Sequence, residues 1–116
     1  MIIAGYGKTL VGMPEGSPFS MTDLATLAYL IENREPGEWA RFGYRKAEDD
    51  LWDARAGGRA TLRARLRLLA SHGIIETKTV GVKGKHGVRT FYKVNMGALG
   101  FIEVSPLVYG IRVLQC

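Results

Sequence analysis

The chain has 116 residues, of which 47% are hydrophobic and 23% charged, values typical of a single globular domain. The formal net charge is +5, from 16 Lys and Arg against 11 Asp and Glu, which favours a polyanionic partner. No apolar run reaches the roughly 18 residues of a membrane span, and the single cysteine, Cys116, excludes an internal disulfide and a thiolate metal cage. We therefore expect no membrane partner, no bound metal and no cofactor.

The charge is unevenly distributed along the chain. Residues 1–58 carry 6 basic and 9 acidic side chains, and residues 96–116 carry one of each. Residues 59–95 carry 9 basic side chains and 1 acidic one, a net charge of +8. The modest total thus conceals a strongly basic central third, and a polyanion is expected to bind there.

The first half of the chain predicts a strand or arm and two helices. Residues 1–19 are glycine-rich with short apolar runs, which are typical of an N-terminal arm or strand. Ser20 stands three residues before Asp23, the arrangement of a capping box, and apolar residues then recur at helical spacing to about Arg34. A short strand over 38–42 and a second helix over 44–56 follow, before the break at Gly57 and Gly58.

The second half predicts a third helix and a hairpin. Thr61 to His72 places leucines on one face of a helix, and Gly73 stands at the usual left-handed stop. Residues 74–80 and 88–95 are rich in β-branched and aromatic residues and flank a glycine-rich loop over 81–87, as in a β-hairpin. Residues 96–116 predict a linker followed by a last strand over 109–114.

The stretch TLRARLRLLASHGIIE, residues 61–76, resembles the winged helix-turn-helix family of bacterial and phage DNA-binding proteins. In that family a Thr and an apolar residue open the recognition helix, two later leucines face the core, and Gly with two aliphatic residues leads into the wing. The resemblance covers residues 20–95 and implies an α+β winged helix-turn-helix domain of three helices and a β-hairpin wing. Extra strands are expected in the N-terminal segment, 1–19, and in the C-terminal linker and strand, 96–116.

The resemblance assigns DNA contacts to the recognition helix and to the wing. At 100° per residue the helix turns its leucines inward and its arginines and small alanines outward, so that it can approach the floor of the major groove. Arginine suits bidentate contact with guanine or with phosphate, and lysines on a mobile loop suit phosphates. The expected DNA-binding residues are Arg59, Ala60, Thr61, Arg63, Ala64 and Arg67 on the helix, and Lys83, Lys85, His86 and Arg89 on the wing.

These expectations favour a sequence-specific double-stranded DNA-binding protein. It would act as a phage or bacterial transcriptional regulator or as a replication accessory factor, in the cytoplasm of a bacterial host cell. Such proteins commonly bind palindromes as dimers, and the terminal strands, 1–12 and 107–115, are the natural place for a homodimer surface or for an intramolecular extension of the sheet. The alternative is a winged-helix protein-binding module, for instance a phage-encoded inhibitor of a host nucleoprotein complex.

An enzyme is not expected. The carboxylates Glu48, Asp49, Asp50 and Asp53 are the only cluster that suggests acid–base or metal chemistry. No second cluster supports them, and we interpret them as a solvated or internally paired helix face.

Overall fold

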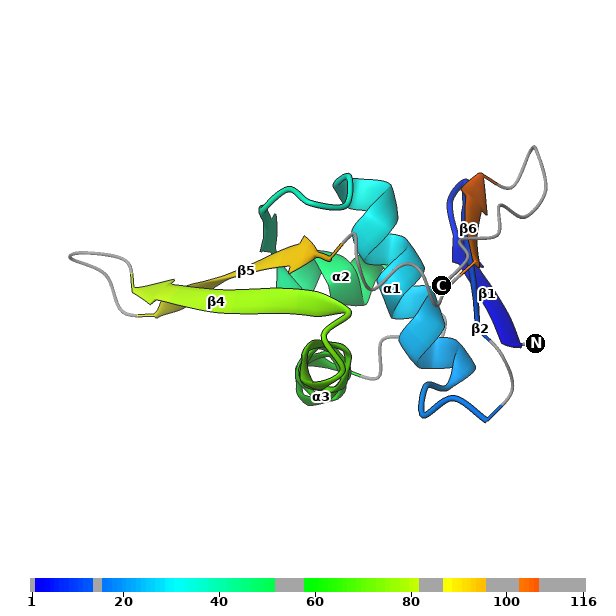
Figure 1. Cartoon of the computed structure of the whole chain (residues 1–116). Helices are drawn as coiled ribbons and strands as arrows, with labels where there is room; N and C mark the ends of the chain where they lie inside the picture. Colours follow the sequence, from blue (N-terminus) through cyan, green and yellow to red (C-terminus); the bar gives the residue numbers. More distant parts are fainter. Residues whose placement is uncertain (1, 14–15, 52–57, 82–86, 96–102, 107–116) are drawn as a thin grey trace.

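The computed structural model describes residues 2–13, 16–51, 58–81, 87–95 and 103–106. In chain order the elements are β1 (Ile2–Tyr6), β2 (Thr9–Met13), α1 (Met21–Asn33), β3 (Ala40–Phe42), α2 (Tyr44–Asp50), α3 (Arg59–Ser71), β4 (Ile75–Gly81), β5 (Val88–Val94) and β6 (Glu103–Pro106). The strands form two antiparallel three-stranded sheets (Figure 1). The α+β class expected from the sequence is therefore confirmed.

The expected helices are present with shifted boundaries. α3 begins at Arg59, two residues before the predicted start, because Gly58 caps it with a φ of 90° that glycine adopts without steric cost. Gly73, with a φ of 73°, follows the helix as the predicted left-handed stop. α2 ends at Asp50 and is shorter than the predicted helix over 44–56, of which residues 52–56 lie outside the described residues.

Helix α1 is the centre of the molecule. Its start carries the expected capping box: the Ser20 hydroxyl accepts a hydrogen bond from the Asp23 N–H at 3.2 Å, and the Asp23 carboxylate accepts one from the Ser20 N–H at 2.8 Å. All residues from Asp23 to Leu30 are buried. Figure 1 shows the reason, since α1 lies between the β1–β2 hairpin on one side and the other helices on the other.

The sheet of order β3-β5-β4 has one buried and one exposed face. Alternate side chains point to opposite faces of a strand. Phe42, Tyr92 and Ile75 are buried in the core. Arg41 and Lys78 are both paired with Phe91 in the strand register, so these three residues form one row on the opposite face.

The second sheet, of order β1-β2-β6, joins the two ends of the described chain. Strand β6 pairs antiparallel to β2, with Val104 opposite Val11. The sequence predicts a linker at this point. The strand is not predicted because Ser105 and Pro106 interrupt the alternation of apolar and polar residues that is typical of a strand. The last strand predicted over 109–114 lies outside the described residues.

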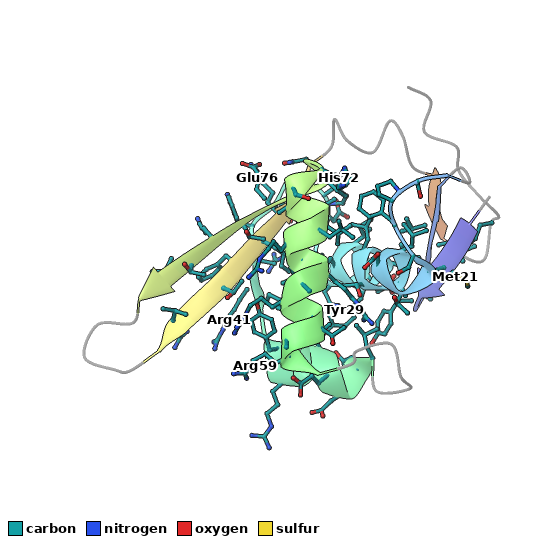
Figure 2. The ribbon with its side chains drawn as sticks, turned by 90° about the horizontal axis from the view of Figure 1, so that it is seen from below. Met21, Tyr29, Arg41, Arg59, His72 and Glu76 are labelled. Carbon is teal, nitrogen blue, oxygen red and sulfur yellow. The ribbon has the colours of Figure 1, made fainter. Side chains whose placement is uncertain are left out.

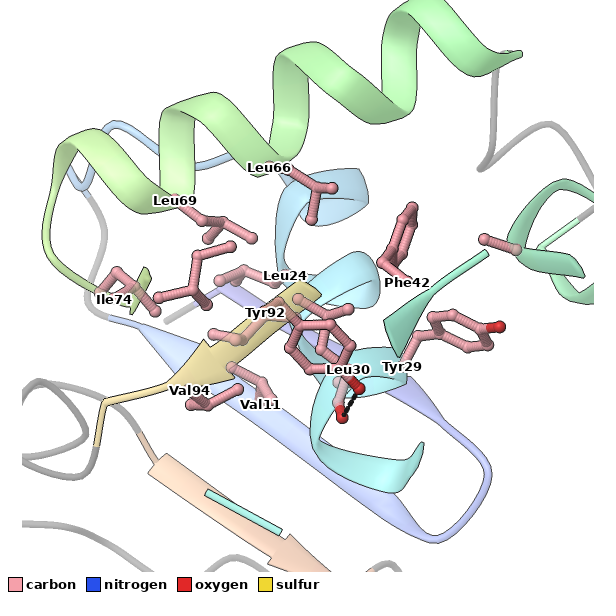
Figure 3. Packing of buried hydrophobic residues seen from close by; sticks show 14 of the residues in the cluster. Val11, Leu24, Tyr29, Leu30, Phe42, Leu66, Leu69, Ile74, Tyr92 and Val94 are labelled. Atoms are coloured by element: carbon pink, nitrogen blue, oxygen red, sulfur yellow. Dashed lines mark hydrogen bonds between the residues drawn. The ribbon is translucent and has the colours of Figure 1, made fainter. Parts of the chain in front are cut away.

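One hydrophobic core unites both sheets and all three helices (Figure 3). Val11 from β2, Leu27 from α1 and Leu69 from α3 are fully buried in the same cluster. The Tyr92 hydroxyl donates a hydrogen bond of 2.9 Å to the carbonyl oxygen of Leu30, and burial raises the pKa of Tyr92 to about 12. Because Val11 belongs to this cluster, the N-terminal hairpin packs on the same core as the helices.

A carboxylate of the acidic cluster ties α2 to α1. The Tyr29 hydroxyl donates a hydrogen bond of 2.8 Å to Asp50, and the Lys46 ammonium lies 2.9 Å from the same oxygen. These two hydrogen bonds hold the pKa of Asp50 below its ordinary value, and the one from Lys46 has the larger effect. The interpretation of this carboxylate as internally paired is confirmed.

We expect an Asp50→Asn variant to melt a few degrees below the wild-type protein at neutral pH, with a difference that shrinks below about pH 4. Because folding lowers the pKa of Asp50, its contribution to the free energy of unfolding is present above the unfolded-state pKa. That contribution is lost as the pH falls through the folded-state pKa. Thermal melts followed by circular dichroism, from neutral pH to below about pH 4, measure the difference in melting temperature. The control is Asp49→Asn, at an exposed neighbouring carboxylate. A difference that stayed constant with pH would contradict the expected role of the carboxylate.

Candidate nucleic-acid interface

The exposed face of α3 carries the arginines that the sequence predicts. Leu62, Leu66 and Leu69 are buried against the core, as expected from their spacing. The opposite face exposes Arg59, Ala60, Arg63, Ala64 and Arg67, while Thr61 is half-buried. The helix therefore presents cations separated by small side chains, a face that another molecule can approach closely.

Beside this face lies a hollow of about 850 Å³. It is bounded by α3, by β3 and the start of α2, and by the β4–β5 hairpin, which extends beside α3 in Figure 2. We call it the basic hollow, because eight of its lining residues are cationic and none of the described lining residues is acidic. The cations are Arg41, Arg45, Lys46, Arg59, Arg63, Arg67, Lys78 and Arg89.

Most of these cations are not neutralised by neighbours. Among the described residues, Lys46 is the one lining cation that makes an ion pair, with Asp50. The six arginines make no ion pair with another described residue. A concave surface lined by charges of one sign focuses the electrostatic field and attracts anions.

Tyr44 organises two of the arginines. The guanidinium carbons of Arg59 and Arg63 lie 5.4 Å and 5.7 Å from the centre of its ring, within the range of cation–π attraction. The ring is itself held edge-to-face against Phe42, at 4.9 Å between centroids. Because Phe42 is buried, Tyr44 is fixed to the core and positions two of the arginines that line the hollow.

The structure brings together part of the predicted site. Arg59, Arg63 and Arg67 from α3 and Arg89 from β5 line the same hollow. Ala60, Thr61 and Ala64 belong to α3 without lining it. Lys83, Lys85 and His86 lie outside the described residues.

The predicted site lacks four cations of the basic hollow and the tyrosine that contacts its arginines: Arg41, Tyr44, Arg45, Lys46 and Lys78. Four of them lie in residues 1–58, where acidic side chains outnumber basic ones, so the regional charge count conceals them. A local signal exists in the sequence Tyr44-Arg45-Lys46, which places cations at the start of a helix directly after a strand. That signal becomes informative only when α2 and α3 are known to be neighbours.

One arginine of α3 does not belong to the exposed face. Arg65 is buried, with 8% of its surface exposed, and its guanidinium lies 3.5 Å from the Thr26 hydroxyl of α1. Burial lowers the pKa of Arg65, and the nearby Asp23 carboxylate partly opposes this effect. Arg65 therefore joins α3 to α1 and is withheld from any ligand in the hollow.

Within the described ranges, no group of three or more His, Cys, Asp and Glu side chains is arranged to hold a metal ion. None of the described helices is long and apolar enough to cross a membrane.

Comparison of the chain with protein family models, with curated proteins and with solved structures finds no match. The basic hollow and the exposed face of α3 are therefore the features of this chain that bear on its function.

Proposed function

We propose that the chain binds double-stranded DNA sequence-specifically, as a winged helix-turn-helix protein with α3 as recognition helix and the β4–β5 hairpin as wing. Support comes above all from the basic hollow, where eight cations from five elements surround a concave surface beside an arginine-bearing helix face. An extended polyanion matches this distribution of charge. Phage or bacterial transcription control and replication are the processes in which such a protein acts.

The dimensions and side chains of α3 suit the major groove. A helix of about 10–12 Å diameter fits a groove about 12 Å wide. Ala60 and Ala64 leave room for the helix backbone to approach the base edges, and Arg63 and Arg67 are long enough to reach guanine acceptors. Arg41 and Arg89, on the opposite wall of the hollow, would then face the phosphates that border the groove.

Binding to duplex DNA is expected to weaken steeply with salt. If five to eight cations neutralise phosphates, the logarithm of the association constant should fall with the logarithm of salt concentration at a slope of about −4.5 to −7. Fluorescence anisotropy with a labelled random 30-base-pair duplex, measured at several salt concentrations, gives this slope. Absence of binding at low salt would overturn the proposal and favour the protein-binding module instead. Selection of bound duplexes from a random pool then tests sequence specificity.

Replacing Tyr44 by leucine is expected to reduce duplex affinity by about 5- to 30-fold, because two cation–π contacts at exposed sites are lost. Arg59 and Arg63 would then have to be ordered at the moment of binding. Tyr44→Phe keeps the ring and should bind nearly as the wild-type protein does. Anisotropy titrations of both variants at one salt concentration measure the difference. Equal loss in the two variants would show that the ring does not act through the arginines.

A further inference from the structure

The exposed face of the β3-β5-β4 sheet combines aromatic rings with cations. We call this surface the outer sheet face and define it by Trp39, Arg41, Glu76, Lys78, Phe91 and Lys93. The five strand residues among them alternate with the buried side chains of the same sheet, and so they point away from the core. Trp39 directly precedes β3 and lies beside Lys78 and Lys93 of this face. Arg41, Phe91 and Lys78 form one row, and Lys93 lies opposite Glu76 in the next.

Two lysines flank the indole of Trp39. The Lys78 ammonium lies 4.1 Å from the centre of the Trp39 ring, and the Lys93 ammonium lies 5.2 Å from it. Lys78 also lies 5.8 Å from the ring centre of Phe91. Trp39 is 38% exposed although indole is among the largest apolar side chains, so the sheet holds an aromatic surface in contact with solvent and cations.

The charge of this surface is positive. It carries three cations, Arg41, Lys78 and Lys93, and one carboxylate, that of Glu76, which forms an ion pair of 3.1 Å with Lys93. Trp39, Phe91 and Lys93 do not line the basic hollow, which makes the two surfaces separable by substitution. Arg41 and Lys78 belong to both surfaces, since each lines the hollow and lies in the Phe91 row, and the Lys78 ammonium lies over Trp39.

We propose that the outer sheet face binds single-stranded nucleic acid, with bases stacked on Trp39 and Phe91 and phosphates bound by the neighbouring lysines. A ring bordered by cations is the combination that single strands use, because each nucleotide offers one flat base and one negative charge. A stacked base contributes more free energy than a cation–π contact at an exposed site, so it can displace the ammonium from the ring. The displaced ammonium then pairs with phosphate.

A duplex does not satisfy this surface, because its bases are already stacked and offer only their edges. An acidic peptide would satisfy the lysines but not the exposed ring faces. Binding at the outer sheet face goes beyond the proposed duplex binding and does not depend on it.

Trp39 itself supplies the readout. The chain has two tryptophans, so a Trp52→Phe background leaves Trp39 as the one fluorescent indole. We expect a 12-nucleotide oligothymidylate to quench Trp39 fluorescence at low salt, whereas a duplex of equal length quenches it far less. In anisotropy titrations with the labelled oligothymidylate, Trp39→Leu should weaken binding by about 5- to 150-fold, the loss of one stacked base.

Three further variants make the result decisive. Trp39→Phe keeps an aromatic ring and should retain most of the binding, which separates stacking from a folding defect. Lys93→Met should weaken binding and flatten its salt dependence, while Met21→Ala, at an exposed apolar position of α1, should have no effect. Absence of quenching, or equal affinity of Trp39→Leu and wild-type protein, would overturn the proposal.

The basic hollow provides the last arm of the test. An Arg63→Ala/Arg67→Ala variant should lose duplex binding and keep quenching by oligothymidylate. If that variant lost single-strand binding while Trp39→Leu kept it, the strand would occupy the hollow and the proposal would be overturned. Failure of duplex binding alone would overturn the proposed function and leave the outer sheet face intact.

Discussion

Replacing Arg63 and Arg67 together by alanine is expected to weaken duplex binding by at least about 30-fold and to abolish sequence preference, since each well-placed arginine contact contributes about 1–3 kcal/mol. Both side chains are exposed, line the basic hollow and lie one helical turn apart on α3. Their removal also takes away the charges nearest the proposed base contacts. Anisotropy titrations against a selected site and a random duplex measure affinity and specificity together.

The matched control is Lys8→Ala/Arg34→Ala. Like the first variant, it removes two positive charges from a chain of formal net charge +5. These two charges lie at exposed positions that do not line the hollow. The control should keep its sequence preference and lose little affinity, because charges far from the contact are screened beyond about 8–10 Å. If the two double variants bound alike, net charge alone would explain binding, and α3 would not be the recognition helix.

Replacing Leu27 by alanine is expected to lower the free energy of unfolding by about 2–5 kcal/mol. Leu27 is fully buried in the middle of α1, the helix that packs on the N-terminal hairpin and on α3 at once. The cavity left behind would border several elements, none of which can move in without leaving its other contacts. Because small domains are stable by about 5–15 kcal/mol in total, this is a large fraction. Urea denaturation followed by circular dichroism measures the change.

Met21→Ala serves as the control for this loss. Met21 begins the same helix but is 60% exposed, so its truncation removes little buried surface and should change the free energy of unfolding by less than about 0.5 kcal/mol. A similar loss in both variants would mean that burial does not determine the cost of truncation, since alanine is the better helix former at both positions. If neither variant changed the free energy of unfolding, Leu27 would not be part of the core that stabilises the fold.

The elements of the fold were largely predictable because their signals are local. The capping box at Ser20, the leucine spacing of α3 and the stop at Gly73 each depend on residues within one or two helical turns. Strand β6 escaped prediction because it has four residues, among them Ser105 and Pro106, and is defined by its pairing with β2. Such a strand has no local signature.

The candidate site was predictable only in part. The outward arginines of α3 follow from helical periodicity, as does the inward position of its leucines. Periodicity does not predict the burial of Arg65, which lies at the edge of the leucine face of α3. Arg65 is buried because it packs against α1, where it contacts the Thr26 hydroxyl. Periodicity gives the direction of a side chain, but its burial depends on the neighbouring element.

By itself, the sequence determined three helices, a β-hairpin and a basic central third, because hydrophobic spacing, capping residues and charge are properties of neighbouring positions. Only the tertiary structure decided that Arg41, Arg45 and Lys46, from the acidic first half, share a hollow with the arginines of α3. It also decided that Tyr44 holds two of those arginines and that two lysines flank Trp39. The physical reason is that these contacts join residues far apart in the chain, and core packing and strand register bring them together.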